Sequence, residues 1–258
     1  MDLELAGKVV VITGGTDGLG LALAERLVAE GAAVAVCGRD EERLASAEAA
    51  LAAAGGDVLA VRADVERAAD ITRLVEGAVA RWGRIDGIVH NAGRSAGGTL
   101  ETNDDATWEG DLRLKVMGAV RLTRTALPQL RESRGAALFT LAISAKAPGA
   151  GSEPSSVSRA AGMALMKALS KELGPDGIRV NAILIGLIES GQWVRMASRS
   201  GTDLPALYER MAVDAAIPLG RVGRAEEFAD LASFLLSARA SYLTGTAINL
   251  DGGLSPAV

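Results

Sequence analysis

Short apolar runs alternate with amphipathic helical patterns along the whole chain. The run VVVITGG at 9–15 is rich in β-branched residues and ends in glycine, which is typical of a strand buried on both faces of a parallel sheet. The segment 19–31 repeats its apolar residues at helical spacing and ends at a glycine, a common helix terminus. The same analysis predicts strands over 9–15, 32–38, 57–65, 85–93, 136–143, 178–184 and 246–250.

The helical patterns fall between these strands, so that strands and helices alternate to the end of the chain. Such alternation indicates right-handed crossovers onto a parallel sheet. No linker rich in Pro or Ser and no repeat interrupts it. We therefore predict one doubly wound α/β domain over 1–258. Its helices are predicted over 19–31, 40–54, 66–81, 107–133, 155–173 and 225–237.

Composition excludes several classes of protein. Hydrophobic residues make up 49% of the chain and charged residues 23%, which is typical of a soluble globular protein. The net charge of −5 and the absence of a basic block argue against nucleic-acid binding. No apolar segment reaches the roughly 18 residues that a membrane span needs, and the N-terminus lacks a signal-peptide pattern. A single cysteine excludes an internal disulfide and favours a reducing cytoplasm.

The segment TGGTDGLG at 13–20 lies between a predicted strand and a predicted helix. In that context Gly14 lets the chain turn, Gly18 lets the backbone approach a pyrophosphate, and Gly20 lets helix and strand pack closely. The helix N-terminus adds free N–H groups and partial positive charge. The alternative is a glycine turn that serves the fold alone.

Motifs along almost the full length resemble the short-chain dehydrogenase/reductase family. The resemblance implies a seven-stranded Rossmann sheet, binding of NAD(H) or NADP(H), and assembly into a homotetramer or homodimer. The motifs are TGxxxGxG at 13–20, ADV at 63–65, HNAG at 90–93, IRVNAI at 178–183, PLGRVG at 218–223 and SYLTGTAINLDGG at 241–253.

The resemblance also implies a cofactor site. Asp64 and Val65 would hold the adenine, and Ile188 and Ser190 would meet the nicotinamide amide. The full set carried over is Gly14, Thr16, Asp17, Gly18, Leu19, Arg39, Asp64, Val65, Asn91, Ala92, Gly93, Arg159, Gly186, Ile188 and Ser190.

The end of the second strand favours NADP(H) over NAD(H). Family members that prefer NAD place an acid there, whereas this chain has Gly38 followed by Arg39. A guanidinium without a carboxylate suits the 2′-phosphate of NADP(H). Asp17 argues the other way because it adds negative charge nearby. The alternative for Arg39 is an exposed charge that opens a helix.

The catalytic residues of the family are replaced. Aligned on its flanks, the family's YSASKAA becomes SSVSRAA at 155–161, which puts Ser155 at the tyrosine position and Arg159 at the lysine position. Ala142 stands at the serine position and Lys115 at the asparagine position. A serine hydroxyl is too weak an acid to replace a tuned phenol. Positioned proton transfer contributes about 10²–10⁴-fold in rate, so ordinary ketone reduction by the family mechanism is not expected.

New polar groups take the place of the lost ones. We expect Lys115 and Arg159 to point into the cleft, where they could stabilise an anionic or enolate-like group. A lysine beside another cation could also have a lowered pKa and act as base or nucleophile. The candidate catalytic residues are Lys115, Ser144, Ser155 and Arg159; no metal site is indicated.

Three hypotheses follow. The first, which we favour from sequence, is an NADP(H)-binding enzyme with non-standard chemistry such as cyclisation, dehydration or isomerisation, for example in secondary metabolism. The second is an NADPH-dependent oxidoreductase with another proton source, acting on an imine, an enone or an activated carbonyl. The third is a non-catalytic partner subunit or cofactor sensor. The segment 190–216 is predicted as a lid over a bulky, apolar small-molecule substrate with an anionic or enolisable group.

Overall fold

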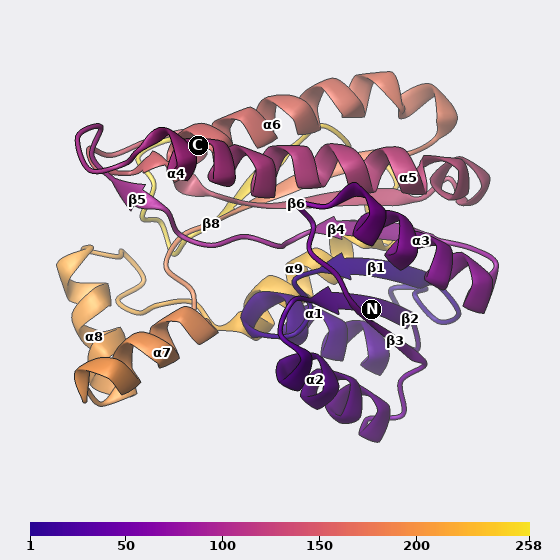
Figure 1. Cartoon of the computed structure of the whole chain (residues 1–258), viewed down its shortest axis with the longest axis horizontal. Helices are drawn as coiled ribbons and strands as arrows, with labels where there is room; N and C mark the ends of the chain where they lie inside the picture. The colour runs from indigo at the N-terminus through magenta and orange to yellow at the C-terminus, as the bar shows by residue number, and fades with distance from the viewer.

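Seven parallel strands form the central sheet of the computed structural model, which describes residues 1–258 (Figure 1). Their spatial order is β3-β2-β1-β4-β6-β8-β9, so the sequence prediction of the fold is confirmed. The strand order reverses between β1 and β4, and ligands of such sheets bind beside the strand ends at that point. The strands are β1 (Val9–Thr13), β2 (Ala33–Gly38), β3 (Val58–Arg62), β4 (Gly87–His90), β6 (Ala136–Ala142), β8 (Arg179–Ile185) and β9 (Ala247–Leu250).

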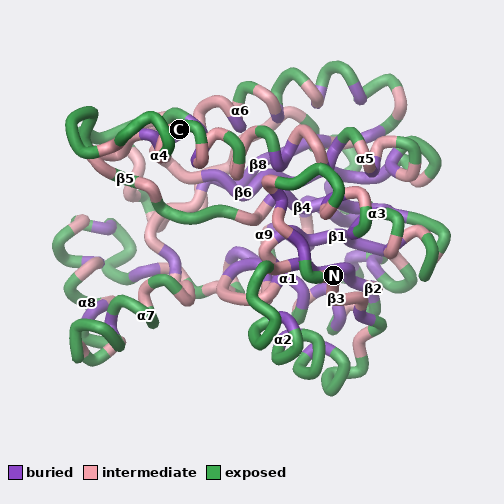
Figure 2. The backbone as a smooth tube through the Cα atoms, in the orientation of Figure 1, coloured by how far each residue is buried: buried purple, intermediate pink, exposed green.

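Helices cover both faces of the sheet (Figure 1). One face packs against α1 (Gly18–Ala29), α2 (Glu41–Ala53) and α9 (Ala225–Leu236). The other face packs against α3 (Ala68–Trp82), α5 (Gly118–Ser133) and α6 (Ser155–Glu172). Buried residues follow the strands, and the outward helix faces are exposed (Figure 2).

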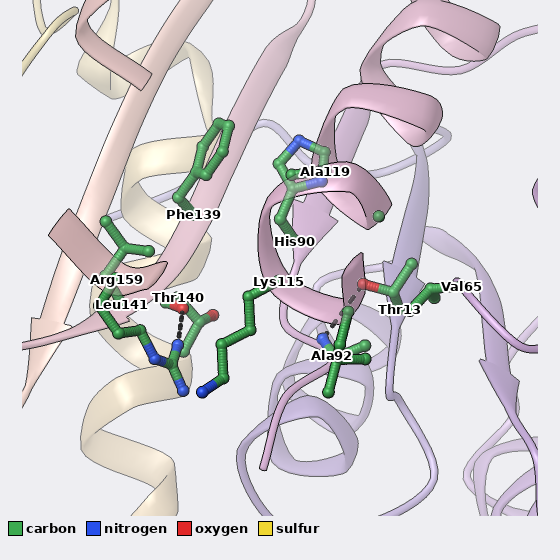
Figure 3. Close-up of a pocket in the computed structure, with 12 residues that line it drawn as sticks. Thr13, Val65, His90, Ala92, Lys115, Ala119, Phe139, Thr140, Leu141 and Arg159 are labelled. Carbon is green, nitrogen blue, oxygen red and sulfur yellow. Dashed lines mark hydrogen bonds between the residues drawn. The ribbon is translucent and has the colours of Figure 1, made fainter. Parts of the chain in front are cut away.

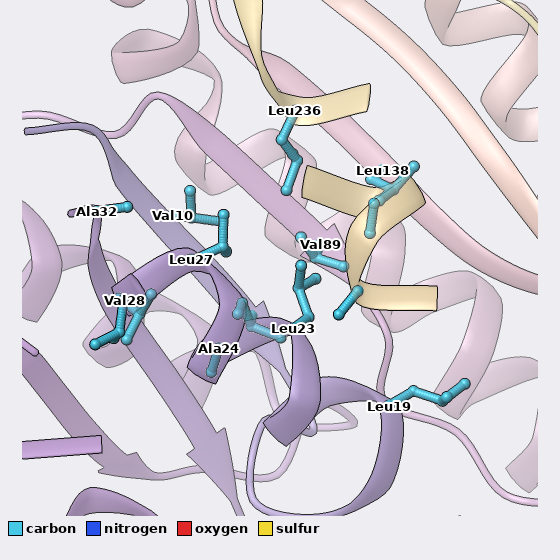
Figure 4. Packing of buried hydrophobic residues seen from close by; sticks show 14 of the residues in the cluster. Val10, Leu19, Leu23, Ala24, Leu27, Val28, Ala32, Val89, Leu138 and Leu236 are labelled. Atoms are coloured by element: carbon cyan, nitrogen blue, oxygen red, sulfur yellow. The ribbon is translucent and has the colours of Figure 1, made fainter. Parts of the chain in front are cut away.

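The alternation of side chains along β1 divides the core into two layers. Val10 and Ile12 belong to the layer under α1 and α9, and Val9 and Val11 belong to the opposite layer. Each layer contains 26 buried residues, so the sheet is equally apolar on both sides, as the continuous apolar run at 9–12 predicts. Figure 4 shows the first layer. Burial of each large aliphatic side chain contributes about 1.5–3 kcal/mol.

The segment predicted as one helix over 107–133 contains a change of helix type. It begins as α4 (Asp105–Leu112), where the Asp104 carboxylate accepts from Thr107 N at 2.9 Å. A π-helical turn, Arg113–Met117, then joins α4 to α5. The prediction missed this turn because apolar spacing does not distinguish a single wide turn from α-helix. Such turns are frequent at functional sites.

Residues 190–216, the lid segment, contain α7 (Gly191–Ser200) and α8 (Leu204–Asp214) (Figure 1). The segment follows β8 beyond its carboxyl end, and its Ala212 packs in a small apolar cluster with Ile217 and Val222, which follow the segment. Two short strands that the sequence did not predict, β5 (Gly97–Gly98) and β7 (Glu153–Pro154), pair antiparallel. No helix has the length and apolar character needed to cross a bilayer.

Candidate active site and cofactor cleft

The side chains of Lys115 and Ser155 meet between two helices. Lys115 lies in the π-helical turn, and its Nζ donates to Oγ of Ser155, the first residue of α6, at 2.6 Å. Asp111 Oδ1 lies 2.6 Å from the same Nζ. Ser158 Oγ donates to Asp111 Oδ2 at 2.5 Å. These four residues therefore form one connected polar network.

Burial changes the acidity of Lys115. Its side chain is 4% exposed and that of Asp111 is 1% exposed. Desolvation lowers the pKa of Lys115 to about 8, the Arg159 charge acts in the same direction, and Asp111 opposes both. An ammonium group with a pKa near neutrality can release and regain a proton at physiological pH.

Arg159 lies one turn after Ser155 on α6. Its Nη1 donates to the backbone oxygen of Thr140 on β6 at 2.5 Å. Burial lowers the pKa of Arg159, but an arginine remains protonated in proteins. Gly93 leaves room for the guanidinium, since a Cβ at that position would lie 3.3 Å from Nη2. The ends of Lys115 and Arg159 point into the same space (Figure 3).

A cavity of about 20 Å³ lies between these two cations and the end of the sheet. Thr13, His90 and Ala92 line it together with Lys115 and Arg159. A volume of this size holds about one water molecule. The cavity therefore accommodates polar side-chain ends and small groups, and is too small for a whole substrate.

The glycine-rich turn has the shape that the motif predicts. Gly14 has a φ of +67°, which favours glycine. A Cβ at Gly20 would lie 2.2 Å from the carbonyl oxygen of Gly14, so a side chain there is incompatible with the turn. Helix α1 begins at Gly18, next to the buried Leu19, and its first N–H groups have no intrahelical acceptor.

Asn91 and Thr13 hold this turn against the end of β4. Asn91 Nδ2 donates to the carbonyl oxygens of Thr13 and Gly14 at 3.1 and 2.9 Å. Thr13 Oγ1 donates to Val89 O and accepts from the backbone N–H groups of Asn91 and Ala92. The predicted cofactor residues of the first and fourth strands are thus brought together.

The last residue of β2, Gly38, packs closely against the glycine-rich turn. A Cβ at Gly38 would lie 2.8 Å from the Thr16 side chain, so glycine is needed for this approach. Arg39 is exposed, and its backbone oxygen accepts from Arg62 Nε at 3.3 Å. Asp64 caps the following turn by accepting from Glu66 N at 3.0 Å, next to the buried Val65.

The loop after β8 forms the opposite wall. A Cβ at Gly186 would lie 2.7 Å from Asp251 Cβ, and Ile188 is buried. Ser190 precedes α7, and its hydroxyl is buried without a hydrogen-bond partner in the protein. A Cβ at Gly18 would lie 3.5 Å from Ser190 Cβ, so the two predicted cofactor segments face each other.

Asp17 connects these two walls. Its Oδ2 lies 2.6 Å from Arg195 Nη1 on α7 and 3.9 Å from Arg43 Nη1 on α2. Two guanidinium groups therefore compensate the carboxylate that the sequence analysis weighed against a 2′-phosphate.

Ser144, the remaining catalytic candidate, does not join the network, and two other polar residues near the site, His90 and Lys146, also lie outside it. Ser144 lies in the 3-10 helix Ile143–Ala145, where its hydroxyl makes no hydrogen bond, and Ala142 ends β6. His90 bonds Thr123 Oγ1 through Nε2 at 3.0 Å. Burial lowers the His90 pKa to about 3, so this imidazole stays neutral and is no proton donor at physiological pH. Lys146 donates to Ala247 O and Asn249 Oδ1, so its ammonium is anchored to β9.

Sequence reasoning missed Asp111, Ser158 and Arg195. Asp111 stands four residues before Lys115, and this spacing within a helix is the signal that could have found it. Ser158 lies three residues after Ser155 on the same helix face. No local pattern relates Arg195 to Asp17, because 178 positions separate them.

Known proteins are similar to this chain over nearly its whole length. A family model described as enoyl-(acyl carrier protein) reductase matches residues 14–255. An uncharacterised oxidoreductase of Mycobacterium bovis is 37% identical over 252 residues, which cover 96% of this chain and 97% of the relative. The chain belongs to the short-chain dehydrogenase/reductase family.

Two solved structures of family members are closely similar. The NADPH-bound short-chain oxidoreductase of Pseudomonas aeruginosa, which contains an atypical catalytic center, has a TM-score of 0.92 and 37% identity, covering 97% of this chain and 98% of that one. L-sorbose reductase of Gluconobacter frateurii, in complex with NADPH and L-sorbose, has a TM-score of 0.94 and 34% identity, with full coverage of both chains.

Proposed function

We propose that this short-chain dehydrogenase/reductase is an NADP(H)-dependent oxidoreductase in which Lys115, in place of a tyrosine phenol, gives the proton to the substrate. One observation carries the proposal: the Lys115 ammonium lies 2.6 Å from Ser155 Oγ, at the position where the family motif has its tyrosine. The similarity to an NADPH-bound oxidoreductase with an atypical catalytic center supports a redox reaction. It favours the second sequence hypothesis over the non-redox chemistry that we favoured from sequence.

The residues present fit NADP(H). Gly14, Gly18 and Gly20 form a turn that side chains would fill, and the unpartnered Ser190 hydroxyl lies across from it. The free N–H groups of α1 suit a pyrophosphate. Arg39 is free to meet a 2′-phosphate, and the negative charge of Asp17 is compensated by Arg195.

The chemistry divides between cofactor and protein. NADPH, when bound, supplies a hydride to the substrate carbon. Lys115 donates a proton from Nζ to the oxygen or nitrogen that gains negative charge. Asp111 and Ser155 fix the direction of Nζ, and Arg159 adds a permanent positive charge beside the same atom. Ser155 is half-buried and accepts the hydrogen bond of the buried amine.

The charges of the site favour a substrate with anionic or enolisable character. Lys115 and Arg159 are two cations, and Asp111 is the one buried anion that faces them. An activated carbonyl, an enone or an imine develops negative charge where these cations converge. The apolar lid residues Tyr208 and Met211 pack against the cluster around Ala212, so a bulky apolar substrate stays a prediction.

A substrate panel tests the proposal. Purified protein that binds NADPH is mixed with 1,3-dicarbonyls, enones and imines, and loss of NADPH absorbance is followed. We expect turnover that Lys115→Met lowers by about 10²–10⁴-fold, the usual contribution of a positioned acid. Lys171→Met, an exposed lysine on α6, is the matched control and keeps full activity. NADPH binding without any turnover across the panel contradicts the proposal and favours the cofactor-sensor hypothesis.

Assembly and location are also proposed. Helices α5 and α6 would form the homo-oligomer interface, as the family resemblance implies; Val157 on α6 and Met117 beside α5 are exposed apolar residues there. Light scattering of the purified chain distinguishes a dimer or tetramer from a monomer. A cytoplasmic location rests on the single cysteine, which is free and buried.

A further inference from the structure

Ser155, Lys115 and Asp111 stand in the order of a nucleophile, its base and the group that orients the base. Lys115 Nζ is 2.6 Å from Ser155 Oγ, and Asp111 Oδ1 is 2.6 Å from Nζ on its other side. A hydroxyl within hydrogen-bond reach of a base, itself oriented by a third group, is the general arrangement of nucleophilic catalysis. Simple proton donation does not require a hydroxyl at this position.

We propose that Ser155 is an activated nucleophile that accepts acyl groups from esters or thioesters, a cofactor-independent activity of the same cleft. Ser155 is half-buried at the start of α6, whereas the side chains of Lys115 and Asp111 are 4% and 1% exposed, so the serine is the most accessible group of the three. The proposal goes beyond the proposed oxidoreductase function and does not rest on it.

The step balances with the groups present. Ser155 Oγ attacks the acyl carbon, and neutral Lys115 takes the hydroxyl proton. The bond from carbon to the leaving oxygen or sulfur breaks, and the Lys115 ammonium returns the proton to that leaving group. Water then attacks the acyl-serine with Lys115 again as base, which releases a carboxylic acid and restores the hydroxyl. No electrons are exchanged, so the step does not need NADPH.

Arg159 is placed to stabilise the oxyanion of this step. It lies one turn after Ser155 on the same face of α6. Its Nη1 is engaged by Thr140 O, whereas Nη2 donates to no protein acceptor and lies beside Gly93 at the cleft. A fixed cation beside a developing oxyanion accelerates acyl transfer.

Lys115 must be neutral to act as the base, so the charged groups around it determine how much of the free amine is present. Arg159 on α6 and Arg94 after β4 disfavour its ammonium form, and Asp111 on α4 favours it. His90 on β4 lines the same cavity and is neutral. Desolvation outweighs the carboxylate, which leaves a substantial fraction of free amine at mildly alkaline pH.

The experiment uses the full chain without NADPH. Wild type is incubated with p-nitrophenyl acetate and, separately, with a fluorophosphonate, and the modified peptide is located by mass spectrometry. We expect nitrophenol release and a covalent adduct on Ser155. Ser155→Ala should abolish the adduct, and Lys115→Met should slow labelling by about 10²–10⁴-fold. Ser152→Ala, whose hydroxyl bonds only Gly149 O, is the matched serine control.

Each outcome of this experiment either supports or overturns the proposed nucleophilic role of Ser155. An adduct on Ser155 that depends on Lys115 supports the proposal, whatever the result of the reductase panel. An adduct on Lys115 itself, equal labelling in Lys115→Met, or no adduct in a wild-type protein that binds NADPH overturns it. Because peptide mapping on wild type locates the nucleophile directly, the test stands even if a variant fails to fold.

Discussion

Arg195 and Asp17 form an ion pair that joins the lid segment to the glycine-rich turn. Nη1 of Arg195 lies 2.6 Å from Oδ2 of Asp17. The carboxylate also rests against the first residue of α7, where a Cβ at Gly191 would lie 2.0 Å from Oδ2. Only glycine at 191 leaves room for this contact, so the start of α7 is held against the glycine-rich turn.

Removal of Arg195 should weaken NADPH binding. Both side chains are partly exposed, at 44% and 38%, and such pairs contribute about 0.2–1 kcal/mol. Arg195→Met leaves Asp17 with only the more distant Arg43, 3.9 Å away, near the proposed 2′-phosphate, so we expect the Kd for NADPH to rise by about two- to fivefold at low salt, and less at high salt. Asp17→Asn should instead tighten NADPH and leave NADH unchanged. Calorimetry measures both; equal effects on the two cofactors would contradict an electrostatic origin.

The two proposed activities of Lys115 should depend on pH in opposite directions. Reduction needs the ammonium form, so its kcat/KM should be level below the Lys115 pKa of about 8 and fall tenfold per pH unit above it. Acyl transfer needs the free amine, so labelling of Ser155 should rise up to that pH and then level. Both profiles are measured on one preparation. Parallel profiles would show that one of the two assignments is wrong.

Asp111→Asn should destabilise the protein, because it leaves the buried Lys115 cation without its counter-charge. Breaking a buried pair costs about 3–5 kcal/mol, whereas removing both charges is often nearly neutral. We therefore expect Asp111→Asn to lower the free energy of unfolding by about this amount, and the double variant Asp111→Asn, Lys115→Met to recover most of it. Glu109→Gln, exposed on the same helix, is the control. Urea denaturation at neutral pH gives the free energy of unfolding of each of these three variants relative to wild type.

The fold was predictable because its determinants are local. β-branched apolar runs such as 9–12 and helical spacing such as 19–29 are decided by neighbours in sequence, and their alternation predicts a parallel sheet with right-handed crossovers. Thr13 and Asn91 also fall where the motifs place them, because each ends a strand beside the same turn. The short pairing of β5 with β7 was not predictable, since two-residue strands carry no periodicity.

The sequence predicted which residues line the candidate site, but not the contacts between them. The alignment indicates that Lys115, Ser155 and Arg159 share a cleft, but not that the lysine bonds the serine. That contact depends on the π-helical turn and on Asp111, which together aim the amine across to α6. The direction in which the Lys115 side chain points depends on its burial and on its contacts with other helices. The spacing of residues in the sequence predicts neither.

The depressed pKa of Lys115 also predicts how stability changes with pH. Between the folded value of about 8 and the unfolded value of about 10.5, the unfolded chain binds more protons than the folded one. Stability attributable to this group therefore rises with pH across that window, by up to about 3 kcal/mol. In the double variant Asp111→Asn, Lys115→Met, this rise in the free energy of unfolding should be absent. Denaturation curves from pH 7 to 10, taken as wild type minus double variant, isolate it; a flat difference would contradict the lowered pKa.

Cys37 offers a reporter of cofactor binding that needs no substrate. It lies in β2, opposite Thr13, and burial raises the pKa of its thiol to about 11, so the native protein should not react with Ellman's reagent at pH 8. Reaction then requires local unfolding around β2, which pairs with β1 just before the glycine-rich turn. NADPH at about 100 times its Kd adds about 2.7 kcal/mol to the folded state, so labelling should slow roughly 100-fold. Gly20→Ala, in which the added Cβ would meet Gly14 O, should abolish this protection. Rapid labelling of the native thiol would contradict its burial, and labelling that NADPH does not slow would mean that the turn does not hold the dinucleotide.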